Sequence, residues 1–126
     1  MRCHQDQFTL GQLIDALKPF KPEAYVRFDF AGMSVDSICS YRGYYEDLAL
    51  VAGGSGLDDV GKLRERLMAA NGETFTGYKG GEFVMLPRTP LWVVEDYSRT
   101  SGGTFIVRVE NRYDAPVLIT RTELDL

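Results

Sequence analysis

The C-terminal part of the sequence constrains the fold most, because its strand-like segments are separated only by short turns. Residues 91–95 and 104–110 are rich in β-branched and aromatic residues, and residues 101–103 between them suit a hairpin loop. Residues 117–120 have the composition of a last strand. A doubly wound parallel sheet needs a helix between most of its strands, and this region has none. The pattern therefore favours an α+β domain with a mainly antiparallel sheet.

Two segments show helical periodicity and helix-capping residues. The first is predicted to begin after Thr9, whose side chain can form a capping box, and to end near Lys18. The second is predicted to begin after Asp59 and to stop at Asn71-Gly72, since both residues tolerate the left-handed conformation that ends helices. Apolar residues recur at helical spacing in both segments, at Leu10, Leu13, Ile14 and Leu17 and at Val60, Leu63, Leu67 and Ala70.

The rest of the chain has the pattern of shorter strands joined by turns. Alternating residue types predict strands at 24–30 and 33–39, and an apolar run predicts one at 48–52. Residues 74–85 combine strand-forming residues with three glycines. Because no linker or repeat interrupts the sequence, we expect residues 1–126 to form a single α+β domain with two helices and about six or seven strands.

Composition and charge limit the classes of function. The chain has 44% hydrophobic and 25% charged residues and a net charge of −4, as an ordinary folded domain does. Its sequence contains no apolar run long enough to span a membrane, and its first residues lack the apolar core of a signal peptide. We therefore expect a cytoplasmic protein with no membrane partner. The negative charge argues against a broad nucleic-acid-binding surface, which needs clustered lysines and arginines.

Cysteine and histidine are scarce. Cys3, Cys39 and His4 are too few for a tetrahedral structural zinc site, so we expect no metal site, and we expect no cofactor. The two widely spaced cysteines are typical of reduced thiols in a cytoplasm. His4 precedes the first predicted element, where a catalytic Ser-His or Cys-His pair would be hard to orient. Catalysis would have to use carboxylates, which makes an enzyme the less favoured alternative.

Two short segments carry residues that suit a small phosphorylated ligand. Residues 41–45 and 77–82 each combine tyrosine, a cation and glycine, and we expect them to meet and line one open cavity. Tyrosine rings can stack on a base, Arg42 and Lys79 can bind phosphate, and glycines let the backbone approach closely. Glu82 can accept a hydrogen bond from a base or ribose. The predicted ligand-binding residues are Tyr41, Arg42, Gly43, Tyr44, Tyr45, Gly77, Tyr78, Lys79, Gly80, Gly81 and Glu82.

A purely structural interpretation of these segments stays open. Tyrosine is common at strand ends, and glycine in a strand often marks a bulge or a tight bend. Arg42 and Lys79 can be ordinary surface charges, and Glu82 can pair with either of them. The glycine-rich stretch at 53–56 is better explained by helix capping than by anion binding, because the acidic residues at 58–59 would repel phosphate.

The chain resembles small uncharacterised proteins of phages and some bacteria in two stretches. One is Ser-Tyr-Arg-Gly-Tyr-Tyr-Glu-Asp-Leu-Ala at residues 40–49, and the other is Thr-Phe-Thr-Gly-Tyr-Lys-Gly-Gly-Glu-Phe at residues 74–83. The resemblance covers roughly residues 40–92 and implies a phage or prophage setting, and hence the host cytoplasm. It implies no functional residue, because no activity is established for the group. One class of small phage proteins sequesters nucleotide immune signals without cleaving them, and this chain is similar to that class in size and site chemistry.

Three functions are consistent with these observations. The first is a counter-defence protein that sequesters a phosphorylated, nucleotide-like signal without cleaving it. The first alternative is inhibition of a host defence protein through an exposed aromatic patch or a free sheet edge, with the strands between residues 91 and 120 most important. The second alternative is a small nucleotide-acting enzyme. Because ligand-trapping sites are often built between subunits, we also expect a homo-oligomer.

Overall fold

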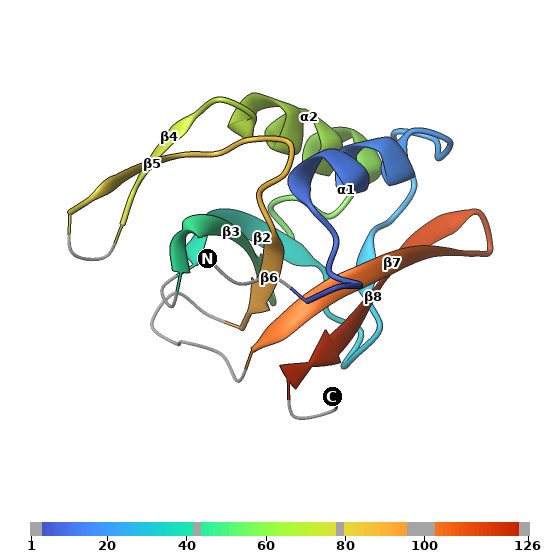
Figure 1. The fold of residues 1–126 in the computed structure, drawn as a ribbon. Coiled ribbons are helices and arrows are strands. Elements are labelled where there is room, and N and C mark those ends of the chain that lie inside the picture. Colours follow the sequence, from blue (N-terminus) through green and yellow to red (C-terminus); the bar gives the residue numbers. More distant parts are fainter. Residues whose placement is uncertain (1–3, 42–43, 78–79, 96–102, 124–126) are drawn as a thin grey trace.

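A six-stranded sheet with helices packed on one face forms the centre of the protein (Figure 1). The computed structural model describes residues 4–41, 44–77, 80–95 and 103–123. The predicted class, a single α+β domain with two helices, is confirmed in this part of the chain. The elements are α1 (Leu10–Leu17), β1 (Arg27–Phe28), β2 (Val35–Tyr41), β3 (Tyr44–Ala52), α2 (Val60–Ala70), β4 (Thr74–Thr76), β5 (Glu82–Val84), β6 (Leu91–Val94), β7 (Thr104–Arg112) and β8 (Ala115–Thr122).

The strand order is β1-β8-β7-β6-β3-β2, and β4 and β5 form a separate antiparallel hairpin. Three neighbouring pairs of the large sheet are antiparallel, whereas β1 is parallel to β8 and β3 is parallel to β6. The β3–β6 pair is parallel because the long connection through α2 and the β4–β5 hairpin returns the chain to the end of the sheet at which β3 begins. The sheet is therefore mixed, and the expected antiparallel pairs form most of it.

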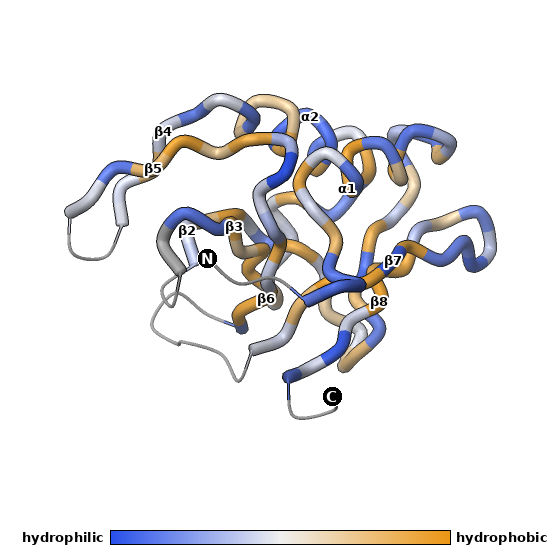
Figure 2. The backbone as a smooth tube through the Cα atoms, in the orientation of Figure 1, coloured by the Kyte–Doolittle hydropathy of each residue, from blue (hydrophilic) through white to orange (hydrophobic). Residues whose placement is uncertain are grey.

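The main core lies between the helices and the sheet. Leu13 of α1 and Leu63 of α2 are fully buried in the same cluster as Leu50 and Leu118 of the sheet. The two helices also contact each other. Figure 2 shows largely apolar strands beneath the helices and a hydrophilic tip on the β7–β8 hairpin. In the described part of the chain, no helix combines the length and apolar character that crossing a membrane requires.

The first strand is much shorter than the sequence pattern predicts. Residues 24–30 alternate in type, but only Arg27–Phe28 pair with β8. Before this pair, the Val26 N–H donates to the Asp58 carbonyl at 2.9 Å, so the chain bonds to the start of α2 instead. The Phe28 N–H donates to the Met33 carbonyl at 2.8 Å, because the chain turns back on itself, and only the Asp29 N–H continues to β8, at 3.1 Å from the Leu118 carbonyl. Tertiary hydrogen bonds therefore set the length of β1.

Asp59 caps α2, as its position before the apolar periodicity predicts, and accepts a hydrogen bond at Oδ1 from the Lys62 N–H at 2.7 Å. Replacing Asp59 with alanine is expected to lower the free energy of unfolding by about 1 kcal/mol, because this N–H loses its partner. Urea denaturation followed by circular dichroism measures the loss. Asp59→Ser should recover most of it, and exposed Asp15 provides a control as Asp15→Ala. Unchanged stability of Asp59→Ala would contradict the capping role.

The N-terminal segment is held in the sheet, which differs from the expectation that His4 lies in a poorly oriented end. The Phe8 N–H donates to the Ile106 carbonyl at 2.7 Å, and the Phe8 carbonyl accepts from the Leu91 N–H at 3.0 Å. Phe8 thus bridges Leu91 of β6 and Ile106 of β7, next to the residues at which these two strands pair directly. The His4 ring stacks on Phe105, with 4.4 Å between centroids, and its Nε2 lies 2.9 Å from Oε2 of Glu123. These contacts orient the histidine against the sheet.

Candidate ligand-binding site

A large bulge interrupts β3 directly after the first predicted binding segment. Ser40 of β2 is opposite Leu48, but the next residue, Tyr41, is opposite Tyr44, so residues 45–47 have no partner on β2. Bulges redirect side chains and are common beside functional sites. Glu46 and Asp47 in this bulge therefore need not follow the alternation of side chains in a regular strand.

Asp47 in this bulge is a buried acid with one unsatisfied oxygen. Its Oδ2 accepts a hydrogen bond from Trp92 Nε1 at 2.8 Å, whereas Oδ1 has no hydrogen-bond partner among the described residues. Asp47 is 0% exposed, and this burial raises its pKa from 3.8 to about 6. The Trp92 hydrogen bond opposes the rise, and the negative charge of Glu46 adds to it. A carboxyl group with a pKa this close to neutrality, beside a pocket, is a candidate functional group.

Trp92 connects Asp47 to aromatic side chains in a second, smaller core. The Tyr41 ring stacks on Trp92, with 4.6 Å between centroids and 3° between ring planes. Phe105 meets Trp92 edge-on at 5.9 Å. We call Tyr41, Trp92 and Phe105 the aromatic cluster. All three rings are buried, so the cluster fixes the indole N–H that Asp47 needs.

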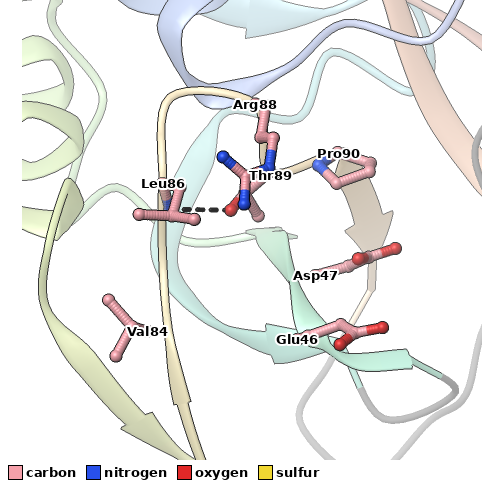
Figure 3. Close-up of a pocket in the computed structure, with 7 residues that line it drawn as sticks. All are labelled: Glu46, Asp47, Val84, Leu86, Arg88, Thr89 and Pro90. Carbon is pink, nitrogen blue, oxygen red and sulfur yellow. Dashed lines mark hydrogen bonds between the residues drawn. The ribbon is translucent and has the colours of Figure 1, made fainter. Parts of the chain in front are cut away.

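A pocket of about 230 Å³ lies between the bulge and the chain that leads from β5 to β6 (Figure 3). Val84 and Leu86 form an apolar wall on one side. In Figure 3 the carboxyl groups of Glu46 and Asp47 point away from this wall. Glu46 is exposed, whereas Asp47 lies beneath the surface, so a ligand in the pocket meets Glu46 first. The pocket is lined by Glu46, Asp47, Val84, Leu86, Arg88, Thr89 and Pro90.

A tight turn places Arg88 at the pocket. The Leu86 N–H donates to Thr89 Oγ1 at 2.8 Å, and the Thr89 N–H donates to the Leu86 carbonyl at 2.9 Å. These two hydrogen bonds close a turn that is flanked by the prolines at positions 87 and 90. Arg88, between them, is exposed, and its guanidinium is drawn beside Thr89 in Figure 3. The turn thus supplies a cation to a pocket that also contains acids.

The first predicted segment forms the turn of the β2–β3 hairpin. Tyr41 is 4% exposed and stacks on Trp92, so its ring is part of the aromatic cluster rather than an open platform for a ligand. Tyr44 and Tyr45 lie at the start of β3, and stacking of their rings on a ligand stays a prediction. Residues 42–43, with the expected phosphate-binding arginine, lie outside the described residues.

The second predicted segment forms the tip of the β4–β5 hairpin. The Gly77 N–H donates to the Gly81 carbonyl, with 2.6 Å between nitrogen and oxygen. Gly80 has a φ of +94°, a conformation that favours glycine, so a turn explains this residue without a ligand. Exposed Glu82 shares a face of β5 with pocket-lining Val84, because side chains alternate along a strand. The two residues between Gly77 and Gly80 lie outside the described part of the chain.

The two hairpins contact each other, β4 with β2 and β5 with β3. The pocket lies where they meet. Glu46 and Asp47 directly follow the first segment, and Val84 follows the second within β5. Residues next to both segments therefore share one pocket, while the role of the segments themselves stays a prediction.

Four residues of the pocket were not predicted as site residues from the sequence: Glu46, Asp47, Arg88 and Thr89. The Pro-Arg-Thr-Pro stretch at 87–90 was the available signal, because a turn between two prolines exposes its polar residues. The burial of Asp47 had no local signal. It depends on Trp92, which lies 45 residues further along the chain.

The described residues contain no group of three or more His, Cys, Asp or Glu side chains that could hold a metal ion. Comparisons of the chain with protein-family models, with curated proteins and with solved structures give no match. The chemistry of the pocket is therefore inferred from the contacts of its own residues.

Proposed function

We propose that this protein binds a small phosphorylated, nucleotide-like ligand in the pocket between the two hairpins and holds it without cleaving it. The observation that carries the proposal is an exposed cation, Arg88, in one pocket with the acids Glu46 and Asp47. A guanidinium binds phosphate in a bidentate geometry, and a carboxylate accepts hydrogen bonds from a base or a sugar. The apolar side chains of Val84 and Leu86 suit the face of a ring.

The lining of the pocket favours binding over catalysis. Its described residues include no histidine, serine or cysteine. Its hydroxyl group, on Thr89, accepts a backbone hydrogen bond that holds the turn. The His4 ring is stacked on Phe105 and is not among the lining residues. Sequestration needs only affinity for the ligand and its slow release. Arg88, Glu46 and the apolar wall can provide both without a proton transfer.

The resemblance of residues 40–49 and 74–83 to phage and bacterial proteins supports a counter-defence role for this binding. The ligand would then be a nucleotide signal of the host, trapped in the host cytoplasm. Assembly into a homo-oligomer is part of the same proposal, because a second subunit would enclose a ligand that one shallow pocket leaves partly exposed.

Arg88→Gln is expected to weaken binding at least tenfold, because it removes a charged hydrogen-bond donor to phosphate. Isothermal titration of cyclic dinucleotides, cyclic trinucleotides and ADP-ribose derivatives should find a ligand with a Kd below about 10 μM for the wild type. The double variant Arg42→Ala, Lys79→Ala tests the two predicted cations. Arg112→Gln, on the β7–β8 hairpin, is the matched control.

Mass spectrometry of the bound ligand separates sequestration from catalysis. An intact ligand after incubation supports the proposal, whereas a cleaved or rearranged product favours a small enzyme. If no member of the panel binds, or if Arg88→Gln binds as tightly as the wild type, the proposed function is wrong.

The β7–β8 hairpin supports a second candidate function, inhibition of a host protein. Tyr113 at its tip is 100% exposed and has a φ of +56°, an uncommon conformation for a bulky residue. Arg108 and Arg112 both donate to Glu110, lower its pKa and hold this face of the strand in place. A hairpin with an exposed tyrosine at its tip suits a protein interface. Loss of a stoichiometric protein partner in Tyr113→Ala, with nucleotide binding unchanged, would favour inhibition.

A further inference from the structure

The two exposed charged groups of the pocket do not neutralise each other. Glu46 and Arg88 are both exposed, and no ion pair joins them in the part of the chain that the structure describes. Behind Glu46, Asp47 adds a second acid, whose Oδ1 has no hydrogen-bond partner among the described residues. The lining therefore offers carboxylates to hydrogen-bond donors and a guanidinium to an anion.

The size of the pocket limits what it can hold. Pockets for whole drug-sized ligands enclose about 300–1,000 Å³. This pocket encloses about 230 Å³, so it accommodates one ring system rather than a whole dinucleotide. Val84 and Leu86 on one side can cover a ring face. Because Glu46 is exposed, its side chain can turn from the direction drawn in Figure 3 to meet the ring edge.

The chemistry of a ring edge decides which base a carboxylate prefers. An ionised carboxylate only accepts hydrogen bonds. The guanine edge presents two adjacent donors, the ring N–H and the amino group, so it matches both carboxylate oxygens. Adenine and cytosine present one amino group beside a ring nitrogen that is itself an acceptor, and that acceptor is repelled by a carboxylate. A pocket with an acidic side should therefore discriminate among bases by their donors.

We propose that the pocket selects a heterocycle with two adjacent N–H donors, as in guanine, with Glu46 as the acceptor and Arg88 holding the attached phosphate. This inference rests on the proposed function, because it requires a phosphorylated ring-bearing ligand in the same pocket. Asp47 acts from behind Glu46, where its charge strengthens the preference for donors without contacting the ligand.

The test titrates the wild-type protein with guanosine, inosine and adenosine 5′-monophosphates, followed by the fluorescence of the single tryptophan, Trp92, and by calorimetry. Guanosine monophosphate is expected to bind about tenfold or more tightly than adenosine monophosphate, with inosine monophosphate between them because it lacks the amino donor. Glu46→Gln should reduce this preference severalfold, because an amide presents a donor as well as an acceptor. Glu65→Gln, an exposed acid on α2, should leave the preference unchanged.

The outcomes separate the two proposals. Arg88-dependent binding of all three nucleotides with equal affinity, or a preference that Glu46→Gln leaves intact, would overturn the inference and leave the proposed function standing. If no nucleotide binds and inorganic phosphate does, the pocket is an anion site and the inference fails. If none of the probes, including the cyclic nucleotides and ADP-ribose derivatives, binds at all, the proposed function fails together with the inference.

Discussion

Replacing Trp92 with alanine is expected to lower the free energy of unfolding by about 4–8 kcal/mol. The substitution opens a cavity among fully buried rings, which commonly costs about 3–5 kcal/mol. It also removes the indole N–H that donates to Asp47 Oδ2, and leaving a buried acceptor without a partner adds about 1–3 kcal/mol. Urea denaturation followed by circular dichroism measures the change, since the variant has no tryptophan signal.

Trp92→Phe separates the two contributions. It keeps an aromatic ring between Tyr41 and Phe105 but removes the N–H donor. We expect a loss of about 2 kcal/mol, well below that of the alanine variant. A phenylalanine variant as stable as the wild type would show that the hydrogen bond to Asp47 contributes nothing. Equal losses in the two variants would contradict the packing contribution of the ring.

Asp47→Asn is expected to stabilise the protein at pH 7.5 by up to about 3 kcal/mol. Burial raises the pKa of Asp47 from 3.8 to about 6, a shift of about two pKa units at about 1.4 kcal/mol each. At pH 7.5 the native state therefore holds an ionised carboxyl group in an unfavourable position. Asparagine removes the charge, and its amide oxygen can still accept the hydrogen bond from Trp92. The gain stays below this limit because the amide nitrogen is itself a buried polar group.

The pH dependence of the stability gain tests its cause. As the pH falls through about 6, native Asp47 takes up a proton, whereas the unfolded chain takes it up only near 3.8. The wild type therefore gains stability from this group over that range, and the advantage of Asp47→Asn should disappear below about pH 4. Urea midpoints at pH 4, 5, 6 and 7.5 measure the difference, with Glu65→Gln, an exposed acid on α2, as the control. A difference that does not change with pH would rule out the titration of Asp47 as its cause.

Local signals were sufficient for both helices. Thr9 forms the predicted capping box with Gln12, and Asp59 caps α2, because a cap acts on N–H groups within one turn of its own residue. The apolar positions of each helix face the core for a similar reason, since their spacing alone puts them on one side. Such features depend on neighbours a few positions away.

Pairing between strands required more than local patterns. The alternation of 24–30 predicts a full strand, yet the N–H groups of Val26 and Phe28 donate to Asp58 and Met33, and the paired strand is only Arg27–Phe28. The parallel β3–β6 pair likewise follows from a long connection whose path no local pattern encodes. Hydrogen bonds of these kinds join residues far apart in the chain, so their partners become known only when the whole sheet is formed.

Residue types that suit phosphate and a ring were visible in the sequence at 41–45 and 77–82, and the fold brings the two hairpins that carry them into contact. The amino-acid sequence read locally thus established the α+β class, the helices and the chemical character of the two hairpin turns. The three-dimensional packing established that Tyr41 is buried against Trp92, that Asp47 is a desolvated acid, and that Arg88 joins the pocket. The physical reason is that burial and electrostatic environment are properties of assembled neighbours, which no single segment contains.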